Sequence, residues 1–139
     1  WVINELDSTV TAYRFGHTGT LEAIQIVPSL PSTFTGDNTG AAIVVSPSGR
    51  FVYASNRGHD SVAIFRVDES NGMLSPVGWE STKGSTPRFI GLTPAGTRLF
   101  AANQRSDSIV EFQVDQATGA LSATGQVVKV NTPVCIVFR

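Results

Sequence analysis

The sequence predicts an all-β protein, a β-propeller built from four-stranded antiparallel blades. The first observation is a repeat: residues 46–49 match residues 93–96, and residues 71–74 match residues 118–121, both 47 positions later. The second is that each repeat holds four short stretches rich in Val, Ile and Phe, bounded by Gly, Pro, Asn and Asp. Four strands in a repeat of about 45 residues are typical of a propeller blade.

The expected elements follow from this repeat in chain order. The first unit lacks an opening strand and aligns with the next at an offset of 53 residues, because residues 29–37 are an insertion. In the middle unit, strands are expected at 41–45, 51–55, 61–67 and 74–80. The predicted units are residues 1–40 with three strands, residues 41–85 and 86–131 with four each, and residues 132–139 as the first strand of a closing blade.

The turns between these strands have recognisable chemistry. The first and second strands of a blade are joined by Ser-Pro-Ser-Gly at 46–49 and Thr-Pro-Ala-Gly at 93–96, in which Pro fixes φ and Gly accepts a positive φ. The third and fourth are joined by hairpins closed by Gly, at 68–72 and 115–119. Twelve strands make about three blades, whereas propellers close with roughly four to eight. We therefore expect further blades of the same protein, or copies of this chain, to complete the ring.

Composition excludes several classes of function. The chain has 10 Lys and Arg against 11 Asp and Glu, a net charge of -1, so nucleic acid is not an expected partner. No apolar run reaches the roughly 18 residues of a membrane helix, and the start has no basic signal-peptide region, so we expect a cytoplasmic protein that does not bind membranes. Cys135, expected inside the last strand as a core residue, cannot form an internal disulfide. Two His and one Cys do not make a zinc site, and neither metal nor cofactor is expected.

Polar residues gather at one end of the predicted blades. Antiparallel strands place the loops between second and third strands at the same end as the links between blades. These segments are residues 4–7, 56–60, 86–88 and 103–107, and they hold most of the ionisable candidates. Loops on a rigid scaffold are where binding and catalysis are usually found, so we expect the functional site at this end, near the central channel.

Glu5, Arg57 and Gln104 occupy the same position in successive repeats. Glu5 is a candidate general acid or base; as an alternative it pairs with Arg57 across adjacent blades, and both readings can hold. Arg57 and Arg88 suit a carboxylate or phosphate, because a guanidinium binds such groups bidentately. Arg88 has the apolar counterpart Ala41, which argues against a purely repeated structural role.

The remaining candidates are less specific. His59 has no counterpart in the other repeats, so it is a candidate ligand-binding residue or a hydrogen-bond partner of the next blade. Asn56 and Gln104 are included as substrate-binding candidates, although Asn recurs at 4, 56 and 103, which is typical of a structural role. Asp recurs before Ser at 7, 60 and 107, and we interpret it as a turn or inter-blade residue.

Two strings carry a family resemblance: Asn-Glu-Leu-Asp-Ser-Thr-Val at 4–10 and Ser-Asn-Arg-Gly-His-Asp-Ser at 55–61. They resemble the lactonase-type seven-bladed propellers, which include the propeller 6-phosphogluconolactonases and the 3-carboxy-cis,cis-muconate lactonizing enzyme. The resemblance covers essentially the whole chain, matches the C-terminal portion of that family and implies about three blades of seven. It also implies a metal-free site at the channel mouth, with its Glu on Glu5 and one of its Arg on Arg57. The family's proposed His and another Arg fall before residue 1.

The resemblance implies an enzyme piece, either a lactone hydrolase or a muconate cyclase, that acts on a small anionic lactone or carboxylate. Arg57 and Arg88 would hold the anion, and Glu5 would act as acid and base or activate water. The alternative is a propeller that serves as a binding or scaffold module without catalysis. Ala42 and Val44, which stand where the family often has Glu and His, favour the alternative.

Overall fold

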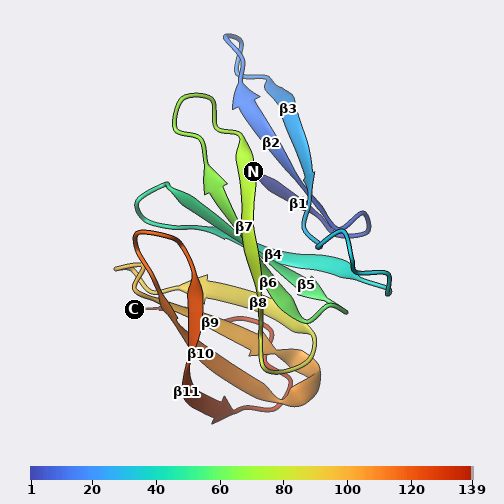
Figure 1. The fold of residues 1–139 in the computed structure, drawn as a ribbon, viewed down its shortest axis with the longest axis vertical. Helices are drawn as coiled ribbons and strands as arrows, with labels where there is room; N and C mark the ends of the chain where they lie inside the picture. Colours follow the sequence, from blue (N-terminus) through green and yellow to red (C-terminus); the bar gives the residue numbers. More distant parts are fainter. Residues whose placement is uncertain (139) are drawn as a thin grey trace.

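Three antiparallel sheets succeed one another along the long axis of the molecule, in chain order (Figure 1). The computed structural model describes residues 1–138. The first sheet contains β1 (Val2–Asn4), β2 (Thr9–Phe15) and β3 (Leu21–Pro28). The second contains β4 (Thr39–Val45), β5 (Phe51–Arg57), β6 (Ser61–Val67) and β7 (Leu74–Ser81). The third contains β8 (Pro87–Leu92), β9 (Arg98–Asn103), β10 (Ser108–Val114) and β11 (Leu121–Lys129).

Within each sheet, every strand pairs with the strand next to it in sequence, so each sheet is an antiparallel meander. This confirms the predicted fold class. Within residues 1–138 the helical structure amounts to one 3-10 turn, η1 (Gln104–Ser106), between β9 and β10. The second sheet begins at Thr39, slightly before the unit boundary predicted at residue 41. No helix of the described part is long and apolar enough to cross a membrane.

The turn chemistry explains where strands end. Gly49 and Gly96 adopt φ values of 73° and 67°, which only Gly reaches without strain. Their N–H groups donate to the carbonyls of Ser46 and Thr93, each at 2.8 Å. Each Pro-Gly turn therefore closes tightly and returns the chain as the next antiparallel strand.

The inner strands of the second sheet, β5 and β6, are buried on both faces because this sheet packs between the other two. Phe51 and Tyr53 of β5 join a core with Leu99 and Phe112 of the third sheet. Val52 and Ala54, which point to the opposite face, join a core with residues of the first sheet. All four β5 side chains are at most 1% exposed, which explains why this strand is continuously apolar rather than alternating.

The strands that open the second and third sheets each contain a β-bulge near their start. In β4 the pairing with β5 shifts between Gly40 and Ile43, and in β8 the pairing with β9 shifts between Pro87 and Phe89. Arg88 is therefore the extra residue of its bulge. A bulge redirects side chains and strengthens the local twist, and here it recurs at the end of the sheets that holds the candidate residues.

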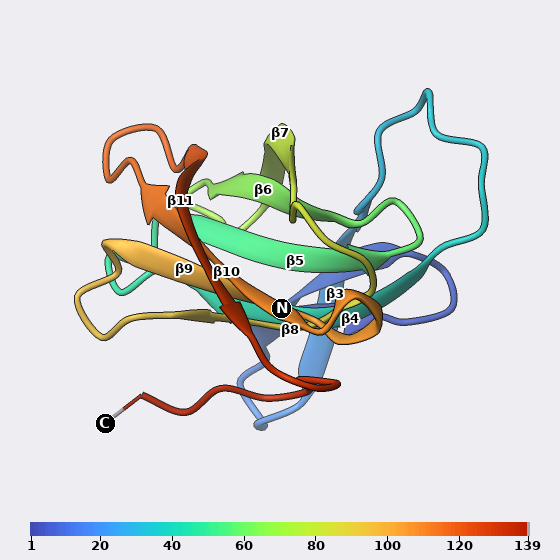
Figure 2. The same cartoon turned by 90° about the horizontal axis from the view of Figure 1, so that it is seen from below.

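The C-terminal segment differs from the sequence prediction. Residues 133–138 form no strand in the structure, so the described residues contain eleven strands rather than twelve. The segment instead runs along the outside of β8 and β9 (Figure 2), and the Phe138 ring lies 5.5 Å from the ring of Phe100. Cys135 is exposed, which corrects its predicted core position, because no strand pairs with this segment to bury it.

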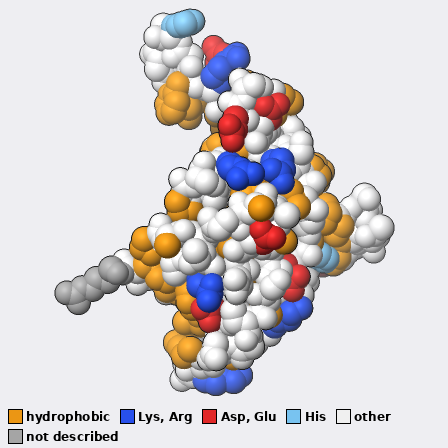
Figure 3. All heavy atoms as spheres, turned by 60° about the vertical axis from the view of Figure 1, so that its left-hand side comes forward, with side chains coloured by type: hydrophobic (Ala, Val, Ile, Leu, Met, Phe, Trp, Pro, Cys, Tyr) orange, Lys and Arg blue, Asp and Glu red, His pale blue; other side chains and the backbone are white. Residues whose placement is uncertain are grey.

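The surface carries basic and acidic side chains in a mixed distribution (Figure 3), in keeping with the net charge of -1. On the face drawn in Figure 3, basic and acidic side chains are interspersed among hydrophobic ones. Exposed apolar side chains occur on the outermost sheets, among them Tyr13 and Ile26 of the first sheet and Val127 and Val128 of the third. The link of residues 29–38 between β3 and β4 projects away from the sheets (Figure 2).

Candidate functional site

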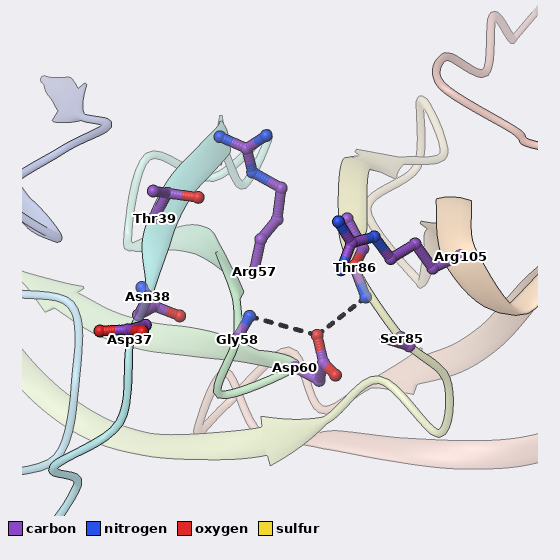
Figure 4. Close-up of a pocket in the computed structure, with 9 residues that line it drawn as sticks. All are labelled: Asp37, Asn38, Thr39, Arg57, Gly58, Asp60, Ser85, Thr86 and Arg105. Carbon is purple, nitrogen blue, oxygen red and sulfur yellow. Dashed lines mark hydrogen bonds between the residues drawn. The ribbon is translucent and has the colours of Figure 1, made fainter.

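A cavity of about 480 Å³ opens at the end of the sheets that the sequence singled out, between the second and third sheets. Nine residues line it (Figure 4). They come from the end of the link of residues 29–38, the start of β4, the end of β5 with its following loop, the link into β8, and η1. The cavity contains two basic side chains, Arg57 and Arg105, and two acidic ones, Asp37 and Asp60.

Glu5 and Arg57 meet beside this cavity. Glu5 follows β1 and Arg57 ends β5, so they occupy corresponding positions of two sheets. Nη2 of Arg57 donates to Oε1 of Glu5 at 2.5 Å. This is the inter-blade ion pair that the sequence offered as one reading of Glu5. The carboxylate end remains accessible, because the Glu5 side chain is 58% exposed while that of Arg57 is 17% exposed.

The guanidinium of Arg57 is only partly satisfied. The same Nη2 also donates to the carbonyl oxygen of Gly40 at 3.0 Å, which fixes the side chain against the start of β4. Its Nε is buried and has no hydrogen-bond partner within residues 1–138. A buried donor without a partner costs free energy, so the position of this guanidinium is not explained by its own hydrogen bonds alone.

Asp60 connects the second sheet to the link that enters the third. Its Oδ1 accepts from the backbone N–H of Thr86 at 2.8 Å and from that of Gly58 at 3.3 Å. Oδ1 of Asp107 accepts from the backbone N–H of Thr132 at 2.8 Å in the same way. This confirms that Asp60 and Asp107 are structural residues of the loops.

The first sheet departs from this pattern by one residue. The position of Asp60, with its positive φ of 52°, is occupied by Ser8 and not by Asp7. Ser8 reaches the next sheet through its Oγ, which accepts from Nδ2 of Asn38 at 2.9 Å. The predicted correspondence of Asp7 is therefore corrected, because strand pairing places Asn4 opposite Thr9, one residue out of step with the sequence match.

Asn56 lies beneath the site rather than on its surface. It is 0% exposed, and its Nδ2 donates to the carbonyl of Ser29 in the first sheet at 2.7 Å. Asn103 repeats this contact one sheet later, where its Nδ2 donates to the carbonyl of Thr82 at 3.0 Å. In place of the ligand contact considered from the sequence, the structure gives Asn56 a role in joining adjacent sheets.

His59 faces the link of residues 29–38. Its Nδ1 lies 2.6 Å from Oγ of Ser61, and its ring meets the ring of Phe34 edge-on at 4.8 Å. Its backbone N–H donates to Oδ1 of Asn38 at 3.0 Å. The histidine therefore fastens the inserted link to the second sheet, and it does not line the cavity.

The structure does not gather the other candidates around the cavity. Arg88 is exposed at the bulge of β8, and Gln104 is half-buried in η1 with its N–H on the carbonyl of Thr86 at 2.9 Å. Sequence reasoning did not select Arg105, which does line the cavity. A signal was present, since Leu6 and Gly58 stand at its position in the other repeats.

The described residues at this end of the molecule do not form a candidate metal centre. Within residues 1–138 there is no group of three or more His, Cys, Asp or Glu side chains that could hold a metal ion. Three ionisable groups have shifted pKa values: Tyr53, Asp68 and Asp115. Burial raises the pKa of Tyr53 to about 12, with a smaller contribution from the charge of Asp115. Hydrogen bonds from Ser70 lower the pKa of Asp68, and backbone N–H groups lower that of Asp115, both in the hairpins at the opposite end.

A family model for lactonases with seven β-propeller blades matches residues 1–138. A 6-phosphogluconolactonase from Bacillus subtilis (strain 168) is 44% identical over 89 residues, which is 63% of this chain and 26% of that protein. The matched part of the chain therefore spans about a quarter of the length of this curated relative.

Solved structures of gluconolactonases, one of them putative, also match this chain over part of their length. The periplasmic gluconolactonase PpgL of Pseudomonas aeruginosa superposes with a TM-score of 0.88 at 33% identity, covering 93% of this chain and 36% of that one. A putative 6-phosphogluconolactonase from Bacteroides fragilis NCTC 9343 gives a TM-score of 0.87 at 41% identity, covering 95% of this chain and 36% of that one. The three sheets thus correspond to little more than a third of each of these chains.

Proposed function

Because the chain belongs to the lactonase family of seven-bladed β-propellers, we propose that it forms part of an enzyme that hydrolyses the lactone ring of a small, anionic sugar acid. The observation that carries the proposal is the ion pair between Glu5 and Arg57. It joins two sheets at the end that holds the cavity, and the third sheet has the uncharged Gln104 at the corresponding position. The pair is therefore not a requirement of the repeat.

The chemistry assigned to this pair is that of a general base and its orienting partner. The exposed Glu5 carboxylate takes a proton from a water molecule whose oxygen attacks the lactone carbonyl carbon. The ring C–O bond then breaks, and the same carboxyl returns the proton to the departing ring oxygen, which gives the open-chain hydroxy acid. Arg57 orients the carboxylate through Nη2 and adds its positive charge to the site of an anionic substrate.

Arg88 remains the second proposed anion-binding arginine for the reacting end of the substrate. It is exposed at the same end of the sheets as Arg57, on the bulge that opens β8. Further blades of the same protein, or further copies of this chain, are proposed to cover the exposed apolar faces of the outer sheets and to supply the rest of the site. The 139-residue chain alone is accordingly expected to be inactive.

The test is Glu5→Gln in the protein that carries the complete ring, whether as one chain or as an assembly. The substitution keeps the shape of the side chain and removes the base, so turnover of a sugar-acid lactone should fall about 10²–10⁴-fold while binding of the product acid changes little. Glu22→Gln is the matched control, since Glu22 also pairs with an arginine, Arg14 at 3.2 Å, at the opposite end of the first sheet. Unchanged turnover in Glu5→Gln would make the carboxylate structural.

One observation favours the second candidate, a binding module without catalysis. Ala42 and Val44 pack against the apolar core between the second and third sheets, and the N–H of Ala42 donates to Oγ of Ser55 at 3.0 Å. These positions are built into the packing and contribute no ionisable group. If the complete protein binds a sugar acid but hydrolyses no lactone of that acid, this second candidate is the correct one.

A further inference from the structure

The hairpins at the end of the sheets opposite the cavity differ in the residue that precedes their turn glycine. Each of these glycines has a positive φ, between 75° and 79°. The preceding residue is Thr in the first and third sheets, at positions 18 and 118, and Asn71 in the second. Asn71 and Gly72 form the one Asn-Gly pair in the sequence. The turn therefore requires its glycine, but it does not require an asparagine before it.

An Asn-Gly pair is chemically reactive because glycine has no side chain to shield its backbone nitrogen. That nitrogen attacks Cγ of the asparagine, a C–N bond forms, the side-chain nitrogen leaves as ammonia, and a cyclic imide remains. Water then opens the imide at one of its two carbonyl carbons and gives aspartate or isoaspartate. Asn71 is exposed, and nothing lies within 4 Å of the position that a Cβ would take on Gly72. The reacting pair is therefore open to solvent.

The folded hairpin nevertheless holds the three groups that must move before the imide can form. The backbone N–H of Gly72 donates to the carbonyl of Asp68 at 2.7 Å. Nδ2 of Asn71, the leaving nitrogen, donates to Oδ2 of Asp68 at 2.9 Å. Oδ1 of Asn71 accepts from the backbone N–H of Met73 at 2.8 Å. Since ring closure breaks these contacts, the reaction proceeds from a locally opened hairpin.

Asp68 is the residue on which the closed form of this hairpin depends. Besides Asn71, its carboxylate accepts from the backbone N–H of Ser70 at 2.9 Å and from Oγ of Ser70 at 2.6 Å. The hydrogen bonds from Ser70, with a smaller contribution from Asn71, lower the pKa of Asp68. Asp115 has the same position in the third sheet and accepts from backbone N–H groups, but the residue before the glycine there is Thr118. The two hairpins therefore form a matched pair, of which one is reactive.

We propose that Asn71 is a site of spontaneous deamidation and that Asp68 sets the rate by holding the hairpin closed. The aspartate product places a second carboxylate against that of Asp68, where an amide had donated, so the two repel each other. The isoaspartate product lengthens the main chain directly before Gly72, whose carbonyl accepts from Nε1 of Trp1 at 3.0 Å. Both products thus weaken a contact that joins the second sheet to the chain entering the first.

The experiment follows the mass of the peptide that contains residue 71 while the protein with the complete ring is incubated at neutral pH. Mass spectrometry of the digested protein measures the conversion of amide to acid, and chromatography separates the aspartate and isoaspartate forms. The wild type should convert slowly and Asp68→Ala about 3- to 10-fold faster, as expected for hydrogen bonds of modest net strength. Asp115→Ala is the matched control and should convert at the wild-type rate. Asn71→Thr, which copies the other hairpins, should show no conversion in this peptide.

The same incubation in urea separates the effect of the fold from the reactivity of the chain. With the hairpin open in both proteins, the wild type and Asp68→Ala should convert at closely similar rates, and the wild type faster than in its folded state. Absence of conversion at residue 71 in the folded wild type would overturn the assignment of the site. Equal rates for folded wild type and Asp68→Ala, or a difference that persists in urea, would overturn the role of Asp68.

Discussion

The two junctions between sheets are built on the same plan but carry different residues. In the first junction, between the first and second sheets, Asn56 donates to the carbonyl of Ser29; in the second, between the second and third, Asn103 donates to the carbonyl of Thr82. Both junctions also enclose an apolar core. These shared contacts hold neighbouring sheets together and account for the Asn that recurs in the sequence.

The differences lie in what is added to that plan. The first junction contains the Glu5–Arg57 ion pair and a long link, residues 29–38, fastened by His59. The second has a short link, residues 82–86, and a 3-10 turn that presents Arg105. Contacts that recur in both junctions serve the fold, whereas residues present in only one are the candidates for recognition and catalysis.

After the loss of the proposed base Glu5, the largest expected effect is that of removing Arg57, which occurs in the first junction alone, on ligand binding. Arg57→Ala is expected to weaken binding of a sugar-acid anion by about 1.5–3 kcal/mol, the range for hydrogen bonds to charged groups. Gln104→Ala, at the corresponding position of the next sheet, should cost much less because its side chain is uncharged. Calorimetric titration with the product acid measures both. Equal losses would show that charge at this position is irrelevant to the ligand.

The shared asparagines should affect stability instead of ligand binding. Asn56→Ala should lower the free energy of unfolding by about 1–3 kcal/mol, because the fully buried Asn56 side chain hydrogen-bonds both the carbonyl and the Oγ of Ser29, and both bonds are lost. Asn103→Ala should cost less, since the Oδ1 of Asn103 is already buried without a partner among the described residues. Urea denaturation of both variants gives the comparison. A larger loss for Asn103→Ala would contradict this account of the two junctions.

The prediction with the smallest effect at neutral pH concerns Tyr53, whose hydroxyl donates to the carbonyl of Gly119 at 3.0 Å in the second junction. Its pKa is raised from 10.0 to about 12, so the folded state retains a proton that the unfolded state loses. The stability contributed by the neutral phenol is present below pH 10 and should be lost as the pH rises from about 10 to 12. Tyr53→Phe should remove this part of the pH dependence, which thermal unfolding at several alkaline pH values can measure.

The sequence predicted the sheets closely because the signals are local. The third strand of the middle unit, expected at 61–67, is β6 (Ser61–Val67). The strand expected at 51–55 is β5, which begins as predicted and ends slightly later, at Arg57. Alternating apolar residues and turn glycines each depend on a few neighbouring positions. The repeat of 47 residues shows the same local signals a second time and so strengthens the prediction. The predicted last strand failed for the opposite reason, since a strand needs a partner, and residues 133–138 have none in the structure.

The sequence by itself determined the blade architecture, the end of the sheets that carries polar residues and the position shared by Glu5 and Arg57, because each follows from periodicity along the chain. Only the tertiary structure decided which residues meet. It placed Asn56 under the site and His59 against the inserted link, and it brought Arg105 into the cavity with Arg57. The physical reason is that these contacts depend on the spacing and twist between separate sheets, which are set by the packing of their apolar faces and are not encoded in any single repeat.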